Sequence, residues 1–417
     1  MIKQFLSSLF NKSLPVKAPN STYSMDQLIH VLTGEAITTK YTPKELVQLH
    51  KNWVYAANNK IASTMSTIPI KLYYKGKPTK TPHKELSTKR LSNIQKAIKK
   101  EVKIVEITEH PILDLFKNIN DNMNYTDMVM QVTQYLGILG TAFVRIERKD
   151  NQIIALHPLL SEYVTPLATN SKDGKITAYE YNIDDKSKVT YSAEDIIQFT
   201  NFIPGNNIIG TGELELCLQA ALRYNYYDAY EMYLAKNNSR PDNLIFNFKK
   251  NLQQKEREEL VKQLKKQYNG VRQVGKPLIA EGELDIKNLG LAPKDLEYQV
   301  GRKWSREEIC AVYGVPLALV TTESINRANA FAAMDFFQKY TIYPKMSRFC
   351  EKMNEQLVSE YDPNAFIWFE ERSVLDPSEQ ANITITAYEK GIIDKNEARS
   401  ILGFEMVDES KGDTNEG

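Results

Sequence analysis

The segment RKWSREEICAVYGVP, residues 302–316, contains both a helix start and a helix stop. Ser305 and Glu308 have the spacing of a capping box, in which the serine oxygen accepts from an early backbone amide and the glutamate reaches back. Gly314 suits the left-handed position after a helix, and Pro316 prevents the helix from continuing. The segment therefore predicts a helix that begins at Ser305 and ends before Gly314.

Downstream of this segment, residues 317–325 have few periodic cues and predict a loop. A helix capped by Asn326 should follow and continue through Tyr340. Pro344 lies within an otherwise helical pattern, so we expect a kink there. One apolar stripe continues beyond it at Met346, Phe349, Met353 and Leu357, and two short helical patterns then surround Gly391.

Upstream, residues 213–236 predict a long helix, with Glu213 and Glu215 in its first turn and Pro241 after its end. Its apolar stripe is expected to consist of Leu214, Leu218, Ala221, Leu222, Ala229 and Met232. A small unit should follow, with a strand at 243–248, a basic helix at 253–268, a glycine-rich turn and a strand at 277–280.

The N-terminal half predicts a mixed α+β body. A helix is expected from Pro43 to Met65 and a strand from Ile68 to Tyr74. Residues 75–103 hold ten Lys or Arg against two Glu with almost no periodic apolar face, which indicates an exposed loop or insertion. Helices at 111–118 and 126–139 should follow, and then short strands through Phe202, separated by Asp-Gly and Asp-Asp turns.

Composition excludes several classes of protein. The 417 residues carry 53 Lys and Arg against 52 Asp and Glu, so a net charge of +1 gives no global attraction to DNA or to an acidic membrane. Cys217, Cys310 and Cys350 are odd in number and lie among apolar residues, which indicates reduced core thiols and a cytoplasmic origin. With no apolar run of about 18 residues and no signal-peptide pattern, we expect neither a secreted nor a membrane-spanning protein.

Two glycine motifs resemble nucleotide sites and fail in detail. Gly270 to Lys276 (GVRQVGK) fits half of a phosphate-binding loop, but position 277 is proline, and the helix precedes the loop instead of following it. Gly210-Thr-Gly212 precedes a helix, but Glu215 stands where the third dinucleotide-binding glycine would be. We interpret the first as a tight turn and the second as a flexible approach to the long helix.

Metal and acid–base sites have little support in the sequence. The five histidines, none at metal-ligand spacing, are His30, His50, His83, His110 and His157. His110-Pro111 and His157-Pro158 are interpreted as starts of structural elements. The acidic pairs at 184–185 and 370–371 have no partner motif, so we interpret them as turns and strand ends. We predict no catalytic residue, no metal and no cofactor.

The segment 242–276 has a strong local charge, with nine Lys or Arg against four acids, about +5 by that count. Two interpretations stay open. It is either a solvated helix face or a surface for nucleic acid or a partner protein.

The order of these segments resembles the phage portal family from about residue 45 to 410. HPILDLF at 110–116, LGILGTAFVR at 136–145, LHPL at 156–159 and EDIIQF at 194–199 match in sequence order. Further matching segments are NNSRP at 237–241 and GKPLI at 275–279. The most specific match is RKWSREEICAVYGVP at 302–316, which is similar to the family pattern ending in E-I-A-x-x-[FY]-G-V-P.

The chain departs from the family pattern at three places. Gly210-Thr-Gly-Glu replaces the commoner G-x-S-P before the long helix, Asn238-Ser replaces N-G, and Gln198 stands where the family often has His. These differences concern local loop geometry.

The resemblance implies an α+β portal fold with an α/β wing, a helical stem, a small α/β clip, a long kinked tunnel helix and a helical crown. By position the parts are the wing at 1–208, stem helix 1 at 209–240, the clip at 241–294, stem helix 2 at 295–316, the tunnel loop at 317–327, the kinked tunnel helix at 328–362, and the wing return with the C-terminal crown at 363–417.

The resemblance also implies a ring of copies of the chain, usually twelve, at one capsid vertex of a siphophage-type virion, assembled in the host cytoplasm. Its partners would be the terminase large subunit, the major capsid and scaffold proteins, and a head-tail adaptor, with no membrane. Double-stranded DNA would pass without sequence specificity along a tunnel loop of Thr321, Thr322, Glu323, Ser324, Asn326 and Arg327. The clip would meet the motor or adaptor through Lys249, Lys250, Arg257, Lys262, Lys265 and Lys266.

Two other classes remain as alternatives. One is a metal-dependent enzyme that processes DNA through Asp and Glu ligands, and the other is a scaffold or adaptor that forms no ring.

Overall fold

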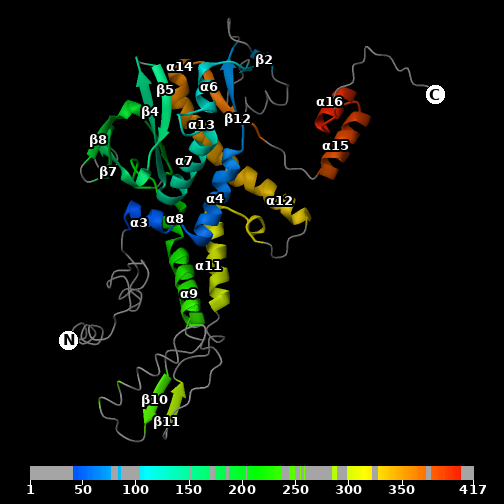
Figure 1. Ribbon diagram of the computed structural model, residues 1–417. Helices are drawn as coiled ribbons and strands as arrows, with labels where there is room; N and C mark the ends of the chain where they lie inside the picture. The colour runs from blue at the N-terminus through cyan, green and yellow to red at the C-terminus, as the bar shows by residue number, and fades with distance from the viewer. Residues whose placement is uncertain are drawn as a thin grey trace. The chain divides into compact units, whose positions relative to one another are not determined.

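The computed structural model describes two neighbouring helices, α4 (Asn52–Ser66) and α7 (Tyr125–Leu139), that pack side by side (Figure 1). The described residues are 41–76, 83–85, 104–150, 152–169, 174–184, 187–202, 204–236, 244–248, 254, 258, 284–288, 298–321, 327–371 and 377–404. The prediction of one helix from Pro43 to Met65 is wrong. A short helix, α3 (Pro43–Gln48), ends first. The chain then turns, and Asn52, the first residue of α4, has a left-handed φ of 51°.

A four-stranded antiparallel sheet joins the two halves of the chain. Its order is β12-β1-β3-β2, with β1 at Ile70–Lys75, β2 at His83–Glu85, β3 at Ile104–Ile107 and β12 at Ala365–Phe369. All five residues of β12 are buried, which explains its unbroken apolar sequence. The segment 75–103 is therefore not wholly an exposed loop, because β2 pairs with β3; most of the rest of it lies outside the described residues.

Two three-stranded antiparallel sheets follow, as the alternating short strands predict. The first has the order β5-β4-β9, from β4 (Thr141–Lys149), β5 (Gln152–Pro158) and β9 (Ile196–Thr200). The second has the order β6-β7-β8, from β6 (Val164–Ala168), β7 (Ile176–Asp184) and β8 (Ser187–Ser192). Two 3-10 turns, η1 (Ser161–Tyr163) and η2 (Ala193–Asp195), precede β6 and β9, and Phe143, Leu159, Tyr179 and Ile196 form a common core.

The predicted helix at 111–118 is present as α6 (Pro111–Lys117). His110 caps it, because its Nδ1 accepts from the Ile112 amide at 3.2 Å. His157 does not start an element, since it lies near the end of β5 and its Nε2 is 2.7 Å from Glu147 Oε2. The two His-Pro pairs thus have different structural roles.

The predicted helix at 213–236 has a break. α8 (Glu213–Leu216) ends before Cys217, and α9 (Leu218–Lys236) then runs beside α11 (Tyr298–Tyr313). The predicted apolar stripe is wrong at its far end, because Ala229 and Met232 are exposed. The tyrosine- and acid-bearing side of α9 faces α11 instead.

A two-stranded antiparallel ribbon is formed by β10 (Leu244–Phe248) and β11 (Leu284–Asn288). The strand predicted at 243–248 is confirmed as β10, and β11 was not predicted. The predicted strand at 277–280 and the GVRQVGK turn lie outside the described residues, as do most positions of the helix predicted at 253–268.

A long interrupted helix follows the 3-10 turn η5 (Leu317–Leu319). It consists of α12 (Arg327–Phe337), the π-helical turn η6 (Gln338–Ile342), α13 (Tyr343–Met353), a second π-helical turn η7 (Asn354–Val358) and α14 (Ser359–Tyr361). A kink was expected at Pro344, and the chain has a π turn, η6, that ends at Ile342, two residues before this proline. Such turns are common sites of helix irregularity. The predicted stripe is confirmed, since Met346, Phe349, Met353 and Leu357 are all buried.

The last described elements are α15 (Pro377–Glu389) and α16 (Lys395–Ile401), which pack against each other on either side of Gly391. Gly391 has a φ of 69°, and Asp394 begins α16 with a capping box to Glu397. This confirms the two short helical patterns around Gly391. Among the described helices, none combines the length and apolar character that crossing a membrane requires.

Candidate functional site

Arg302 of α11 joins the two antiparallel helices α9 and α11. Its guanidinium donates to Glu231, to Asp228 at 3.2 Å and to the hydroxyl of Tyr224 at 3.0 Å, and it lies 5.1 Å from the centre of the Tyr224 ring. The three partners stand four and three residues apart on α9, so they share one face of that helix. One arginine therefore binds three side chains on the same face of the neighbouring helix.

A second arginine joins the same helices in the opposite direction. Arg223 of α9 donates to Ser305 Oγ at 3.1 Å and to Glu308 at 2.6 Å. Ser305 is fully buried in the middle of α11, and its hydroxyl donates to the Gly301 carbonyl at 2.9 Å. The predicted capping box at Ser305 and Glu308 is therefore wrong, because α11 begins at Tyr298 and both residues bind α9.

The C-terminus of α11 ends as predicted and contacts the long helix. Gly314 has a φ of 67°, its amide donates to Ala311 at 3.1 Å, and the amide of Val315 donates to Cys310 at 2.9 Å. This pair of bonds is the Schellman arrangement. Thr341, in the π turn η6, donates to the Gly314 carbonyl at 2.6 Å, so the end of α11 is bonded to the irregular turn of the long helix.

Gly210 and Gly212 form a closely packed approach to α8 and not a flexible one. A Cβ on Gly210 would overlap the backbone of Asn201 and Gly140, and a Cβ on Gly212 would overlap the backbone of Ile138. Only glycine permits this contact between the chain before α8 and the end of α7. The two glycines therefore serve close packing. This role does not require the third glycine of a nucleotide-binding motif.

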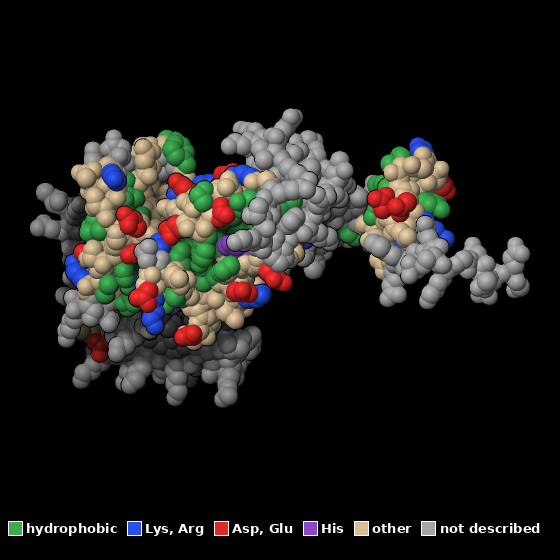
Figure 2. All heavy atoms as spheres, turned by 90° about the horizontal axis from the view of Figure 1, so that it is seen from above, with side chains coloured by type: hydrophobic (Ala, Val, Ile, Leu, Met, Phe, Trp, Pro, Cys, Tyr) green, Lys and Arg blue, Asp and Glu red, His purple; other side chains and the backbone are tan. Residues whose placement is uncertain are grey.

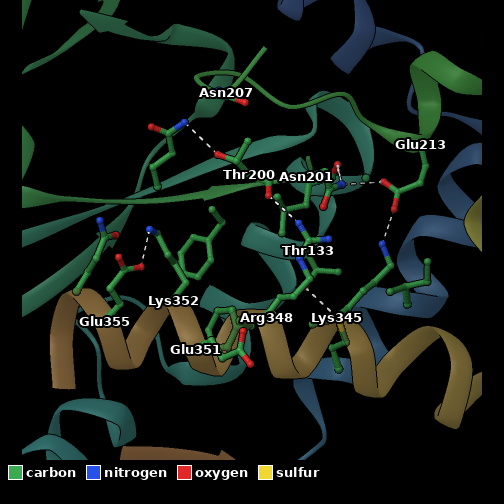
Figure 3. A pocket seen from close by; sticks show the side chains of 18 of the residues that line it. Thr133, Thr200, Asn201, Asn207, Glu213, Lys345, Arg348, Glu351, Lys352 and Glu355 are labelled. Carbon is green, nitrogen blue, oxygen red and sulfur yellow. Dashed lines mark hydrogen bonds and ion pairs between the residues drawn. The ribbon is translucent and has the colours of Figure 1, made fainter. Parts of the chain in front are cut away.

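A pocket of about 640 Å³ lies between α13 and the segment that joins β9 to α8 (Figure 3). Lys345, Arg348 and Lys352 of α13 point into it. Lys345 pairs with Glu213, Arg348 donates to the Thr200 carbonyl at 2.8 Å, and Lys352 pairs with Glu355 at 2.8 Å.

The pocket offers little chemistry. Its charged lining consists of three cations and three acids, Glu213, Lys345, Arg348, Glu351, Lys352 and Glu355, so the charges balance. Deep in it, buried Gln198 accepts from the Tyr179 hydroxyl at 2.8 Å and donates to the Ile208 carbonyl at 2.5 Å and to Thr200 Oγ1 at 3.0 Å. The lining is suited to holding β7, β9 and α13 together.

The cysteines are unsuited to nucleophilic chemistry. All three are buried and free, in agreement with the predicted core thiols. Burial raises the pKa of Cys217 to about 12 and that of Cys310 to about 11, so both remain thiols at neutral pH. Among the described residues, no cluster of His, Cys, Asp and Glu could hold a metal ion.

The predicted site residues are only partly placed. Thr321 is half-buried, and its hydroxyl donates to the Leu317 carbonyl at 3.1 Å. Arg327 is the first residue of α12, and the description does not extend to its side chain. The remaining tunnel-loop residues, Thr322, Glu323, Ser324 and Asn326, and the clip residues Lys249, Lys250, Arg257, Lys262, Lys265 and Lys266 all lie outside the described residues.

The arginine contacts between α9 and α11 were not predicted. Their signal was present in the spacing of Tyr224, Asp228 and Glu231, a face of aromatic and acidic residues that a basic partner helix could match. The partner itself, Arg302, is separated by more than seventy residues and could not be assigned from periodicity.

The chain is similar in sequence and in fold to known proteins. Residues 52–403 match the model of the family described as Phage portal protein. The portal protein of Escherichia phage T5 is 27% identical over 164 residues, which cover 38% of this chain and 39% of that protein. The fold is similar to the neck of a native gene transfer agent particle computed with C12 symmetry, with a TM-score of 0.56, 18% identity, and coverage of 91% of this chain and 99% of that one. It is also similar to an HK97 family phage portal protein from Corynebacterium diphtheriae, with a TM-score of 0.52, 13% identity, and coverage of 81% and 96%.

Proposed function

The chain belongs to the phage portal protein family, and from this premise we propose that copies of it close into a ring, with twelve as the expected number, at one vertex of a capsid. The family is one of structural proteins and not of enzymes. The ring would be the channel through which DNA enters during packaging and leaves during ejection. The observation that carries the proposal is the family match over residues 52–403, which spans the described elements from α4 to α16.

The division into parts is proposed along the same lines. β12 pairs with β1, which supports the assignment of residues 363 onward to a return into the wing before a crown. The antiparallel pair α9 and α11 supports the assignment of two stem helices, and the ribbon of β10 and β11 supports a small clip at 241–294.

The two arginine contacts give the proposed stem a mechanical role. Arg302 and Arg223 each bind the opposite helix at more than one side chain, so α9 and α11 would move as one unit. A rigid pair suits a channel wall that keeps its diameter while DNA moves. The bond from Thr341 to Gly314 would connect this pair to the tunnel helix.

DNA must slide along such a channel without being gripped at its bases, so weak phosphate contacts are required. The near-zero net charge of the chain supports this role. We propose that the tunnel loop faces the DNA, and Arg327 is its single cation among Thr321, Thr322, Glu323, Ser324, Asn326 and Arg327. The basic clip would dock the terminase large subunit and later the adaptor, while the wing and crown would face the capsid and scaffold proteins.

The first experiment is a mass measurement of the purified chain at several concentrations, with negative-stain images. We expect closed rings of several hundred kilodaltons. A chain that stays monomeric or dimeric would favour a scaffold or adaptor protein instead. Incubation with plasmid DNA and magnesium tests the remaining alternative, because cleavage by the chain would identify a nuclease.

The tunnel-loop assignment is tested by Arg327→Glu in a packaging reaction. We expect rings of normal mass and a reduced yield of packaged DNA, because a carboxylate would repel phosphate at this position. Arg327→Lys is the matched control and should package nearly normally. Normal packaging by Arg327→Glu would contradict the assignment of residues 317–327.

A further inference from the structure

The helix pair α15–α16 has almost no core of its own. Of its described residues 380–404, Thr384 is the only one that is buried, at 4% exposure. Six large apolar side chains of the pair are exposed, namely Ile383, Ile385, Tyr388, Ile392, Ile401 and Phe404. Figure 2 shows apolar side chains at the surface of this pair. Two short helices cannot be stable in water on propensity alone, so the pair requires apolar cover from outside.

The side of α15 that faces α16 is identified by two polar residues. Gln380 Nε2 contacts the Ile401 carbonyl of α16 at 3.5 Å, and the Thr384 hydroxyl donates to the Gln380 carbonyl at 2.7 Å. Residues four apart lie on one face of a helix, so Gln380 and Thr384 share the side toward α16.

Ile383 and Ile385 stand directly before and after Thr384. At about 100° per residue, they lie on opposite flanks of α15, each about 100° from the side that faces α16. Their exposed fractions are similar, 52% and 48%. The helix α15 thus presents one exposed isoleucine on each of two separate flanks.

The number of flanks selects the occupant. A two-fold dimer covers one self-complementary patch, and a single adaptor protein would cover one flank and leave the other in water. A closed ring built from head-to-tail contacts needs two different patches on every subunit. We propose that the Ile383 flank of α15 in one copy packs against the Ile385 flank in the next, so that the α15–α16 pairs form a continuous belt. This inference rests on the proposed ring and assigns a contact within it.

Engineered cysteines test the contact in the full-length chain. The natural cysteines are all buried and should not interfere. Ile383→Cys and Ile385→Cys are made singly and together, the chains are assembled, and disulfides are formed with copper phenanthroline. Within one chain the two side chains point apart, so an internal bridge is disfavoured.

Head-to-tail packing predicts three results on a non-reducing gel. The double variant gives a ladder of products up to the full ring, each single variant stays at the monomer position, and an equal mixture of the two single variants stops at cross-linked pairs. Dimers from a single variant would show that like flanks meet and would overturn the inference. Rings of the double variant that form normally but give no ladder would also overturn the inference. The proposed function would stand in that case. A wild-type chain that never forms rings would overturn the proposed function as well.

Discussion

Replacing Gln198 with methionine tests the buried polar bridge beneath β7 and β9. Methionine has nearly the volume of glutamine, so the change leaves no large cavity. It removes the acceptor of the Tyr179 hydroxyl and the donor to the Ile208 carbonyl, both in buried residues. Each group left without a partner costs about 1–3 kcal/mol, so Gln198→Met should lower the free energy of unfolding by roughly 2–6 kcal/mol.

The assay is urea unfolding followed by circular dichroism at fixed protein concentration, because assembly adds to apparent stability. Gln198→His is the matched comparison, since one ring nitrogen can accept from Tyr179 while the other donates to Ile208. It should lose less stability than Gln198→Met. A double-mutant cycle with Tyr179→Phe should give a coupling energy of about 0.5–3 kcal/mol. A loss below about 0.5 kcal/mol for Gln198→Met, or additive effects in the cycle, would refute the reasoning.

Three further changes have defined outcomes. Arg302→Met should lower stability by roughly 1–3 kcal/mol in thermal unfolding, since its ion pairs are partly exposed and individually weak, and Arg302→Lys should restore only part of it. Gly212→Ala should cost at least about 3 kcal/mol and reduce soluble yield, because its Cβ would overlap the Ile138 backbone; an unchanged melting temperature would contradict that packing. Burial lowers the pKa of His50 to about 4 in the folded chain, whereas an unperturbed histidine in the unfolded chain has a pKa of about 6.5. Between these pH values the unfolded chain binds more protons at this residue than the folded chain does, so the free energy of unfolding should fall as pH drops from about 6.5 toward 4. His50→Gln should flatten that slope in urea unfolding at about pH 7 and pH 5, and an equally steep slope would exclude His50 as its source.

Local sequence signals predicted the elements whose determinants are local. Gly314 and Pro316 correctly placed the end of α11, because a left-handed glycine cap depends on neighbouring residues alone. The stripe that includes Met346 and Phe349 was also correct, since a single buried face preserves its period through α13. The strand β12 was not predicted, although its five buried residues form an unbroken apolar run that is a local signal.

Signals that depend on distant partners misled the prediction. Ser305 and Glu308 have capping-box spacing, yet both bind Arg223, which lies more than eighty residues away. The predicted stripe on α9 assumed an apolar neighbour, whereas α11 supplies Arg302, so a polar side of α9 turns inward. A helical pattern fixes which residues share a face, and tertiary contacts decide which face is buried.

The residues of the candidate site also fall into two groups, those expected from the sequence and those found only in the structure. Family resemblance supplied the tunnel loop and the clip, whose residues are mostly outside the described ones, while the arginine contacts between α9 and α11 came from the structure. Gly210 and Gly212 show why composition alone was insufficient. A glycine needed for close packing and a glycine needed for freedom look identical in sequence.

The two π turns on either side of α13 have a consequence for changes of chain length. A π turn closes its hydrogen bonds over one more residue than an α turn, so it behaves like a single-residue insertion stored in a helix. Side chains of both turns bond to other elements. The Thr341 hydroxyl of η6 donates to the Gly314 carbonyl. The Asn354 side chain of η7 donates to the Ile367 carbonyl at 3.0 Å and accepts from the Ile367 amide at 2.7 Å. Deleting one residue within 338–342 could therefore convert the turn to α-helix and leave the buried face of α13 in register, whereas a deletion inside α13 would rotate that face by about 100°. Relatives that differ in length along this helix should carry their gaps at these two turns.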